Sequence, residues 1–238
     1  MFPFIFYVIS YSSVLPFSAQ LIATNSSSLW GHPSAVFFTP SLIGEKTKLE
    51  SSITSFIFLT SFKIYGFSFS YNKVAIGMQY VGTRDINEKY YVFGFSRKLR
   101  DVDFGLSILV NEKDFEGFAS REILGTLALS RGVEDIIFGA SFTKNTSTMK
   151  NSLNIFAILI ESLGCTYIDY IFYQNERTFS LSQEFNVLPL LTLSIGYSKD
   201  PDQYFVGLYL KSYIKPAISL RYLQNLGYVI TSGIEYTF

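Results

Sequence analysis

The sequence predicts an all-β protein: a single antiparallel β-barrel of about fourteen strands that spans a membrane, preceded by an N-terminal plug-like segment. Two observations support this prediction. The composition is too apolar for an ordinary soluble surface, and apolar and polar residues alternate with a period of two from about Glu50 to the C-terminus.

The composition excludes both a typical soluble domain and a bundle of membrane helices. The 238-residue chain is 48% hydrophobic and contains 24 Phe and 17 Tyr. Charged residues make up 16% of the chain, against about a quarter in soluble domains. Beyond the N-terminus, the longest apolar run lies around Ile155 to Ile160, far short of the ~20 residues that a membrane helix requires.

The alternation separates an apolar face from a face of small polar residues. In FKIYGFSFSY, Tyr65, Phe67 and Phe69 lie on one face, and Gly66 and Ser68 lie on the other. A soluble sandwich usually carries many Lys and Glu on its outward face, whereas Gly, Ser and Thr suit an enclosed, wet interior. We therefore expect the apolar face to contact lipid and the sheet to close, because lipid cannot satisfy an open sheet edge.

The pattern predicts about fourteen strands of a length that suits tilted transmembrane strands. They lie near residues 50–60, 62–71, 73–83, 88–99, 102–112, 120–131, 133–144, 150–161, 165–173, 177–187, 190–199, 203–213, 215–224 and 227–238. Very short turns should alternate with longer polar connections such as 83–88 and 112–119, as in barrels with one periplasmic and one exterior end. The first connection, near Ser61, is shorter than this scheme requires.

The C-terminal stretch GYVITSGIEYTF resembles the closing strand of a bacterial outer-membrane barrel. Tyr228, Ile230 and Tyr236 alternate with polar residues, and the chain stops at Phe238. In that class, the terminal aromatic forms a signal for the barrel-assembly machinery, which implies a role for Tyr236 and Phe238. The resemblance implies an outer-membrane location with lipid around the barrel, and a soluble edge strand is the alternative.

The N-terminal region divides into two predicted parts. Residues 1–19 are apolar and read as a signal peptide with no firm cleavage position, since Phe17 occupies a position where a small residue is expected. A single membrane anchor is the competing interpretation. Residues 20–48 form a periplasmic or plug-like segment, and residues 49–238 form the barrel. Pro33, Pro40 and neighbouring glycines argue against a regular element here.

The segment after Trp30 resembles the pre-barrel motif of the PorV/PorQ family, which is associated with type IX secretion and lies within the FadL-like barrels. The shared positions are Pro33, Ser34, Ala35, Phe37 and Pro40, within the stretch from His32 to Ile43. Thr39 replaces the Asn of the family, and Ser41 and Leu42 replace Ala-Gly. The resemblance implies a fourteen-stranded barrel with a plug or gate that contains Trp30, His32, Pro33, Ser34, Ala35, Phe37, Thr39 and Pro40.

The residue inventory argues against an enzyme. His32 is the only histidine and precedes the barrel, so no triad forms on the barrel wall, and it lacks a second His or Cys for a metal site. The single cysteine, Cys165, excludes a disulfide framework. With zero net charge and no basic cluster, nucleic acid is not an expected partner. The charges expected to face the lumen, where they balance one another, are Asp103, Glu184, Lys211, Arg221 and Glu235.

Three functional hypotheses follow, none of which needs a cofactor. The first is a PorV/PorQ-like barrel that binds or shuttles secreted proteins or secretion-machinery subunits at the outer membrane. The second is a FadL-like transporter of hydrophobic small molecules across that membrane. The third is a structural barrel without transport.

Overall fold

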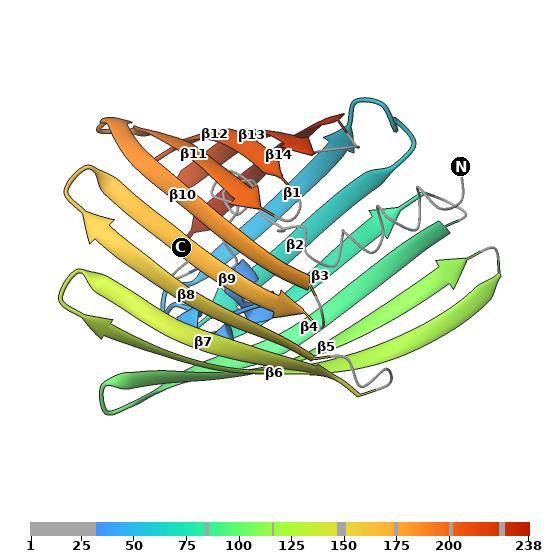
Figure 1. Ribbon diagram of the computed structural model, residues 1–238, viewed down its shortest axis with the longest axis horizontal. Helices are drawn as coiled ribbons and strands as arrows, with labels where there is room; N and C mark the ends of the chain where they lie inside the picture. Colours follow the sequence, from blue (N-terminus) through green and yellow to red (C-terminus); the bar gives the residue numbers. More distant parts are fainter. Residues whose placement is uncertain are drawn as a thin grey trace.

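The computed structural model describes residues 32–83, 86–115, 117–146, 151–173, 176–199, 202–223 and 227–238. In this part of the chain, fourteen β-strands form a closed barrel (Figure 1). The strands are β1 Lys48–Phe56, β2 Lys63–Tyr71, β3 Val74–Gly82, β4 Ile86–Leu99, β5 Val102–Phe115, β6 Phe118–Val133, β7 Ile136–Asn145, β8 Asn151–Glu161, β9 Gly164–Tyr173, β10 Glu176–Leu188, β11 Leu191–Lys199, β12 Gln203–Leu210, β13 Ile214–Leu223 and β14 Gly227–Thr237. The predicted fold class, a closed antiparallel β-barrel of about fourteen strands, is confirmed.

Each strand pairs antiparallel with the next strand in the chain, and β14 returns to pair with β1. This closing seam runs from Lys48 opposite Thr237 to Phe56 opposite Val229. Closure leaves no edge strand with unpaired backbone groups, which is the condition for a sheet in lipid. The predicted signal peptide, residues 1–19, and Trp30 lie outside the described residues.

The two faces of the wall differ as the alternation predicts. On β2, Tyr65 is 48% exposed on the outside of the barrel, whereas Ser68 on the inner face is 2% exposed. Aromatic and aliphatic side chains cover the outside of the other strands in the same way. This apolar exterior is typical of a barrel in contact with lipid. Among the described residues, no helix is long and apolar enough to cross a bilayer.

The connections differ from the prediction at two places. We call the end where β1 begins and β14 finishes the turn end, and the opposite end the loop end. The expected long loop at 112–119 is wrong, because β5 continues to Phe115 and β6 begins at Phe118. Ion pairs such as Lys113–Glu122, at 3.3 Å, stabilise this polar extension of the ladder. The first connection occupies residues 57–62 at the loop end, so it is longer than expected.

A segment without strands lies inside the barrel and is drawn in blue in Figure 1. It contains two short 3₁₀ helices, η1 Pro33–Phe37 and η2 Pro40–Leu42, which pack against β1 to β6. Each helix begins with a proline, whose fixed φ and missing N–H suit a first helical position. The prolines were expected to prevent any regular element in this segment. This expectation is wrong, because each proline begins a short 3₁₀ helix.

Candidate functional site

The interior segment, residues 32–44, provides most of the predicted gate motif. Phe38 and Gly44 are half-buried, and the other residues of the segment are buried. The buried motif residues are His32, Pro33, Ser34, Ala35, Phe37, Thr39 and Pro40. The sequence motif therefore corresponds to a structural unit, packed against the inner face of the wall.

Glycines on three adjacent strands make room for this segment. A Cβ built on Gly77 of β3 would lie 2.3 Å from the Phe37 ring, and one on Gly94 of β4 would lie 2.7 Å from Val36. On β5, a Cβ at Gly105 would lie 2.1 Å from the backbone nitrogen of Ser41. These glycines allow the interior segment to approach the wall more closely than any side chain would permit.

A buried ionic cluster joins the interior segment to the closing seam. The Nδ1 atom of His32 lies 2.7 Å from Oε1 of Glu50 on β1 and 2.7 Å from Oε2 of Glu235 on β14. The Nζ atoms of Lys48 and Lys215 lie 3.4 Å and 2.7 Å from Oε1 of Glu235. One imidazole therefore contacts both strands that complete the barrel.

Glu50 is the central acceptor of this cluster and was not singled out from the sequence. Its carboxylate accepts hydrogen bonds from the Ser68 hydroxyl at 2.9 Å and from the Ser34 backbone N–H at 3.2 Å. Burial lowers the pKa of His32, but the nearby carboxylates of Glu235 and Glu50 raise it more, so the pKa lies above its usual value of 6.5. The imidazolium form is thus favoured, and it strengthens the attachment of the interior segment.

The same three side chains form a candidate metal-ligand set. The ligand atoms of His32, Glu50 and Glu235 all lie within 4.8 Å of one another. One imidazole and two carboxylates can bind a divalent cation. However, the ammonium groups of Lys48 and Lys215 already balance the two carboxylates, so a divalent cation would add two uncompensated charges to a buried site. The charges favour an anchoring role for the cluster.

The four predicted lumen charges other than Glu235 occupy four different environments. Glu184 is buried and accepts a hydrogen bond from the Tyr167 hydroxyl at 3.1 Å. Arg221 is 2% exposed, and its guanidinium carbon lies 5.9 Å from the ring centroid of Phe205. Lys211 lies just beyond β12, where its ammonium donates to the side-chain oxygen of Asn186.

Asp103, the fifth predicted charge, lies at the turn end of β5 and pairs with Lys73 at 3.5 Å. It does not belong to the His32 cluster. The structure therefore brings Glu235 together with His32 and places the other four predicted charges elsewhere. The signal for Glu50 was present in its inward position on β1, but sequence alone does not show that Glu50 and Glu235 are opposite each other.

Part of the inner wall is apolar, contrary to the expected lining of small polar residues. Phe156 and Ile158 on β8, Ile137 on β7, and Tyr167 on β9 are buried in one hydrophobic cluster with the interior segment. The sequence signal is the run around Ile155 to Ile160, in which both faces are apolar. The barrel thus encloses an apolar region along β7 to β9, in addition to the polar cluster at the seam.

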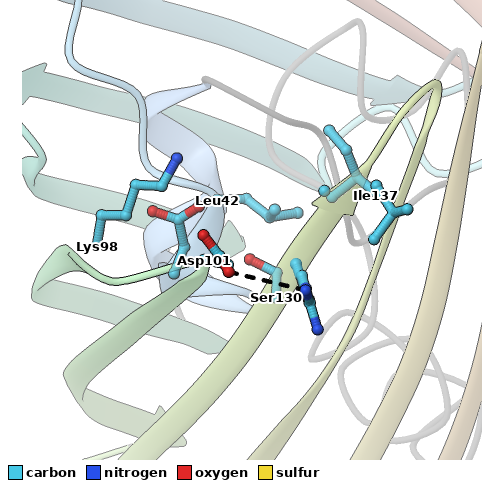
Figure 2. Close-up of a pocket in the computed structure, with 9 residues that line it drawn as sticks. Leu42, Lys98, Asp101, Ser130 and Ile137 are labelled. Atoms are coloured by element: carbon cyan, nitrogen blue, oxygen red, sulfur yellow. Dashed lines mark ion pairs between the residues drawn. The ribbon is translucent and has the colours of Figure 1, made fainter.

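A cavity of 360 Å³ lies at the turn end beside η2 (Figure 2). Its lining combines charged, small and apolar residues: Leu42, Lys98, Asp101, Asp103, Ser130, Arg131, Gly132, Val133 and Ile137. Figure 2 shows Lys98 and Asp101 on the side of the β4–β5 turn and Ile137 on the opposite side. The cavity was not predicted from the sequence, because its residues come from two hairpins, β4–β5 and β6–β7, and from the interior segment.

The C-terminal aromatics lie next to each other at the turn end. The ring centroids of Tyr236 and Phe238 are 4.4 Å apart in an edge-to-face arrangement. The Phe238 backbone N–H donates to the Thr47 carbonyl at 3.0 Å, while its side chain is 69% exposed. The Phe238 ring therefore contributes little to the packed interior.

The closed fourteen-stranded barrel with an apolar exterior belongs to the structural class of transmembrane β-barrels. The comparison with solved structures supports this fold. A FadL homologue from Pseudomonas aeruginosa matches with a TM-score of 0.68 and 8% identity, covering 94% of this chain and 99% of that chain. A mutant of the Rh. blastica porin matches with a TM-score of 0.53 and 9% identity, covering 81% of this chain and 99% of that chain. No family model and no curated protein matches the chain. At these identities, the likenesses show the fold.

Proposed function

We propose that the protein is a non-enzymatic conduit for hydrophobic small molecules in a bacterial outer membrane, with the interior segment as its gate. The observation that supports this most strongly is the apolar inner wall of β7 to β9, packed beside a segment that one ionic cluster attaches to the seam. Small-molecule sites are mostly apolar and enclosed, with a few polar groups. The likeness to a FadL homologue is consistent with this role.

Two further proposals concern location and assembly. The exposed apolar exterior suits lipid, which favours an outer-membrane barrel inserted by the barrel-assembly machinery. The exposed Phe238 ring is accessible to such machinery.

The PorV/PorQ-like role in secretion is the second candidate. Its support is the motif from His32 to Leu42, whose buried residues form the interior segment. Against it, the connections between the described strands are short at both ends, which leaves little loop surface for a large protein partner. A structural barrel without transport would fit the same fold and has no specific observation in its favour.

Uptake by whole cells tests the conduit. The full chain would be expressed in a bacterium whose outer membrane excludes the apolar dye N-phenyl-1-naphthylamine, and the rate of dye entry would be followed by fluorescence. We expect faster entry with the native protein than with an empty vector. Phe156→Asp places a charge on the apolar wall and should abolish the increase.

Asn154→Asp is the matched control, because it adds the same charge on the inner face of the same strand at a position that is already polar. It should retain most of the uptake, at equal protein levels in the outer membrane. Equal entry with the native protein and the empty vector would refute the conduit. Co-purification of a stoichiometric protein partner, with no bound lipid, would favour the secretion role.

A further inference from the structure

The cavity beside η2 contains charges of both signs in equal number. Lys98 and Arg131 supply two cations, and Asp101 and Asp103 supply two anions. A simple anion bound there would face two carboxylates, and a simple cation would face two basic groups. The lining as a whole therefore matches a ligand that carries one charge of each sign.

These charges are weakly engaged within the protein. Arg131 lies 3.8 Å from Asp101, and Lys73 lies 3.5 Å from Asp103, both beyond the 2.7–2.9 Å that is usual for a strong charged hydrogen bond. Lys98 has no ion-pair partner in the part of the chain that the structure describes, although it lies opposite Asp103 in the β4–β5 register. The Arg131–Asp101 pair is exposed and the Lys73–Asp103 pair is half-buried. Pairs at these distances contribute little stability, so a ligand can replace them at small cost.

The opposite side of the cavity is apolar. Leu42 of η2, Val133 at the end of β6 and Ile137 of β7 contribute aliphatic side chains, and Leu42 and Ile137 are buried. Figure 2 shows Leu42 between the charged side and Ile137. A volume of 360 Å³ is at the small end of the range of ligand pockets, which suits one small molecule.

We propose that this cavity binds a small zwitterion with an aliphatic substituent, of the kind represented by an aliphatic α-amino acid. The ligand carboxylate pairs with Lys98 and Arg131, its ammonium group with Asp101 and Asp103, and its aliphatic group contacts Leu42 and its neighbours. The site adjoins the apolar wall of the conduit, with which it shares Ile137. Its occupancy can be measured without transport, so the proposal does not rest on the proposed function.

Three probes with one carbon skeleton test the charge requirement. Leucine carries both charges, 4-methylpentanoate lacks the ammonium group, and 3-methylbutylamine lacks the carboxylate. Binding to the purified full chain in detergent micelles would be measured by isothermal titration calorimetry, with empty micelles as the blank. We expect saturable leucine binding, with each singly charged probe weaker by at least about tenfold, as expected for the loss of one charged hydrogen bond.

Two variants assign the two charges. Lys98→Met should weaken leucine and 4-methylpentanoate by about tenfold and leave 3-methylbutylamine unchanged, and Asp103→Asn should weaken leucine and 3-methylbutylamine. Lys113→Met, which removes a lysine far from the cavity at the loop-end extension of β5, is the control and should bind leucine like the native protein. β-Sheet circular dichroism verifies that each variant is folded.

Several outcomes would overturn the proposal: no saturable leucine binding, equal binding of all three probes, or leucine affinity unaffected by Lys98→Met. A preference for 4-methylpentanoate over leucine would replace the zwitterion site with a simple anion site. None of these outcomes bears on dye uptake, so failure here and failure of the conduit are distinguishable.

Discussion

Gly105→Ala provides a direct test of whether the interior segment depends on close contact with the wall. A Cβ at position 105 would lie 2.1 Å from the nitrogen of Ser41 and 2.2 Å from the carbonyl carbon of Pro40. Ordinary Cβ contacts begin at 3.4 Å, so the backbone of η2 would have to retreat by about 1.3 Å (3.4 minus 2.1). Because the obstacle is backbone, no change of rotamer relieves the overlap.

The cost follows from the packing of the segment. Overpacking a well-packed core costs typically 1–3 kcal/mol, and a backbone contact places this substitution near the upper limit, at about 3 kcal/mol. A loss of that size changes the ratio of docked to undocked segment by roughly a hundredfold. Elsewhere in a strand, replacing Gly by Ala is neutral or stabilises by about 0.4–1 kcal/mol, because it restricts the unfolded chain.

Native-state hydrogen exchange measures this ratio. The amides of Thr39 and Leu42 donate to the carbonyls of Ala35 and Thr39, at 2.8 Å and 2.9 Å, so docking protects them. In Gly105→Ala, their exchange should accelerate by roughly a hundredfold, while the amides of β8 to β10 exchange as in the native protein. Gly125→Ala is the matched control, since a Cβ there meets nothing within 4 Å. Unchanged protection of Thr39 and Leu42 in Gly105→Ala would refute the close-packing argument.

The remaining predictions concern the ionic cluster and the C-terminus. Because the pKa of His32 is raised above 6.5, the stabilisation from its charged form is complete below about pH 6.5 and is lost as the pH rises through the raised pKa. Protection of the interior segment, corrected for intrinsic exchange rates, should therefore fall as the pH rises above the usual value of 6.5. His32→Gln should be less protected at about pH 6 and show no such pH dependence, and a native profile in this variant would contradict the reasoning. Glu50→Ala leaves the Ser34 N–H and the Ser68 hydroxyl without an acceptor and removes one of the two carboxylates beside His32, so it should lower the stability of docking by about 3 kcal/mol. Glu50→Gln should lower it less, and equal protection in both variants and the native protein would count against the cluster as the anchor. Removing Phe238, whose ring is 69% exposed, should reduce the amount of assembled barrel in cells but change the unfolding midpoint of the purified barrel little, and Phe238→Tyr serves as the control. An unchanged yield would argue against an assembly signal.

The fold was largely predictable because successive residues of a membrane-barrel strand face lipid and the barrel interior in turn, and each environment selects a different kind of residue. On β2, the apolar Tyr65 lies on the outside of the barrel and the small polar Ser68 lies on the inside. The same alternation of apolar and polar residues located all fourteen strands. The rule is weaker where the wall extends as a polar ladder, so the pattern predicts a loop at 112–119, where β5 continues to Phe115 and β6 begins at Phe118.

The candidate site was less predictable, because it depends on which inward residues meet across the barrel. Alternation places Glu50 and Glu235 on the inner face, but only the closing register puts them opposite each other, and only the path of the interior segment brings His32 between them. The apolar wall at Phe156 violates the simple pattern of polar inside and apolar outside. The cavity near Lys98 depends on the β4–β5 and β6–β7 hairpins and η2 together.

The position of His32 on the seam has a consequence for how the barrel forms. Every strand pairing except β1 with β14 joins consecutive strands, so the seam is the one contact whose loop-closure entropy spans nearly the whole barrel. Two kinds of contact offset this entropy loss: the backbone hydrogen bonds of the β1–β14 ladder, and the His32 imidazole, which contacts Glu50 on β1 and Glu235 on β14. The interior segment therefore acts as a cross-link between the first and last strands. A chain that lacks it would form the same hairpins, but its β1–β14 pairing would be less stable.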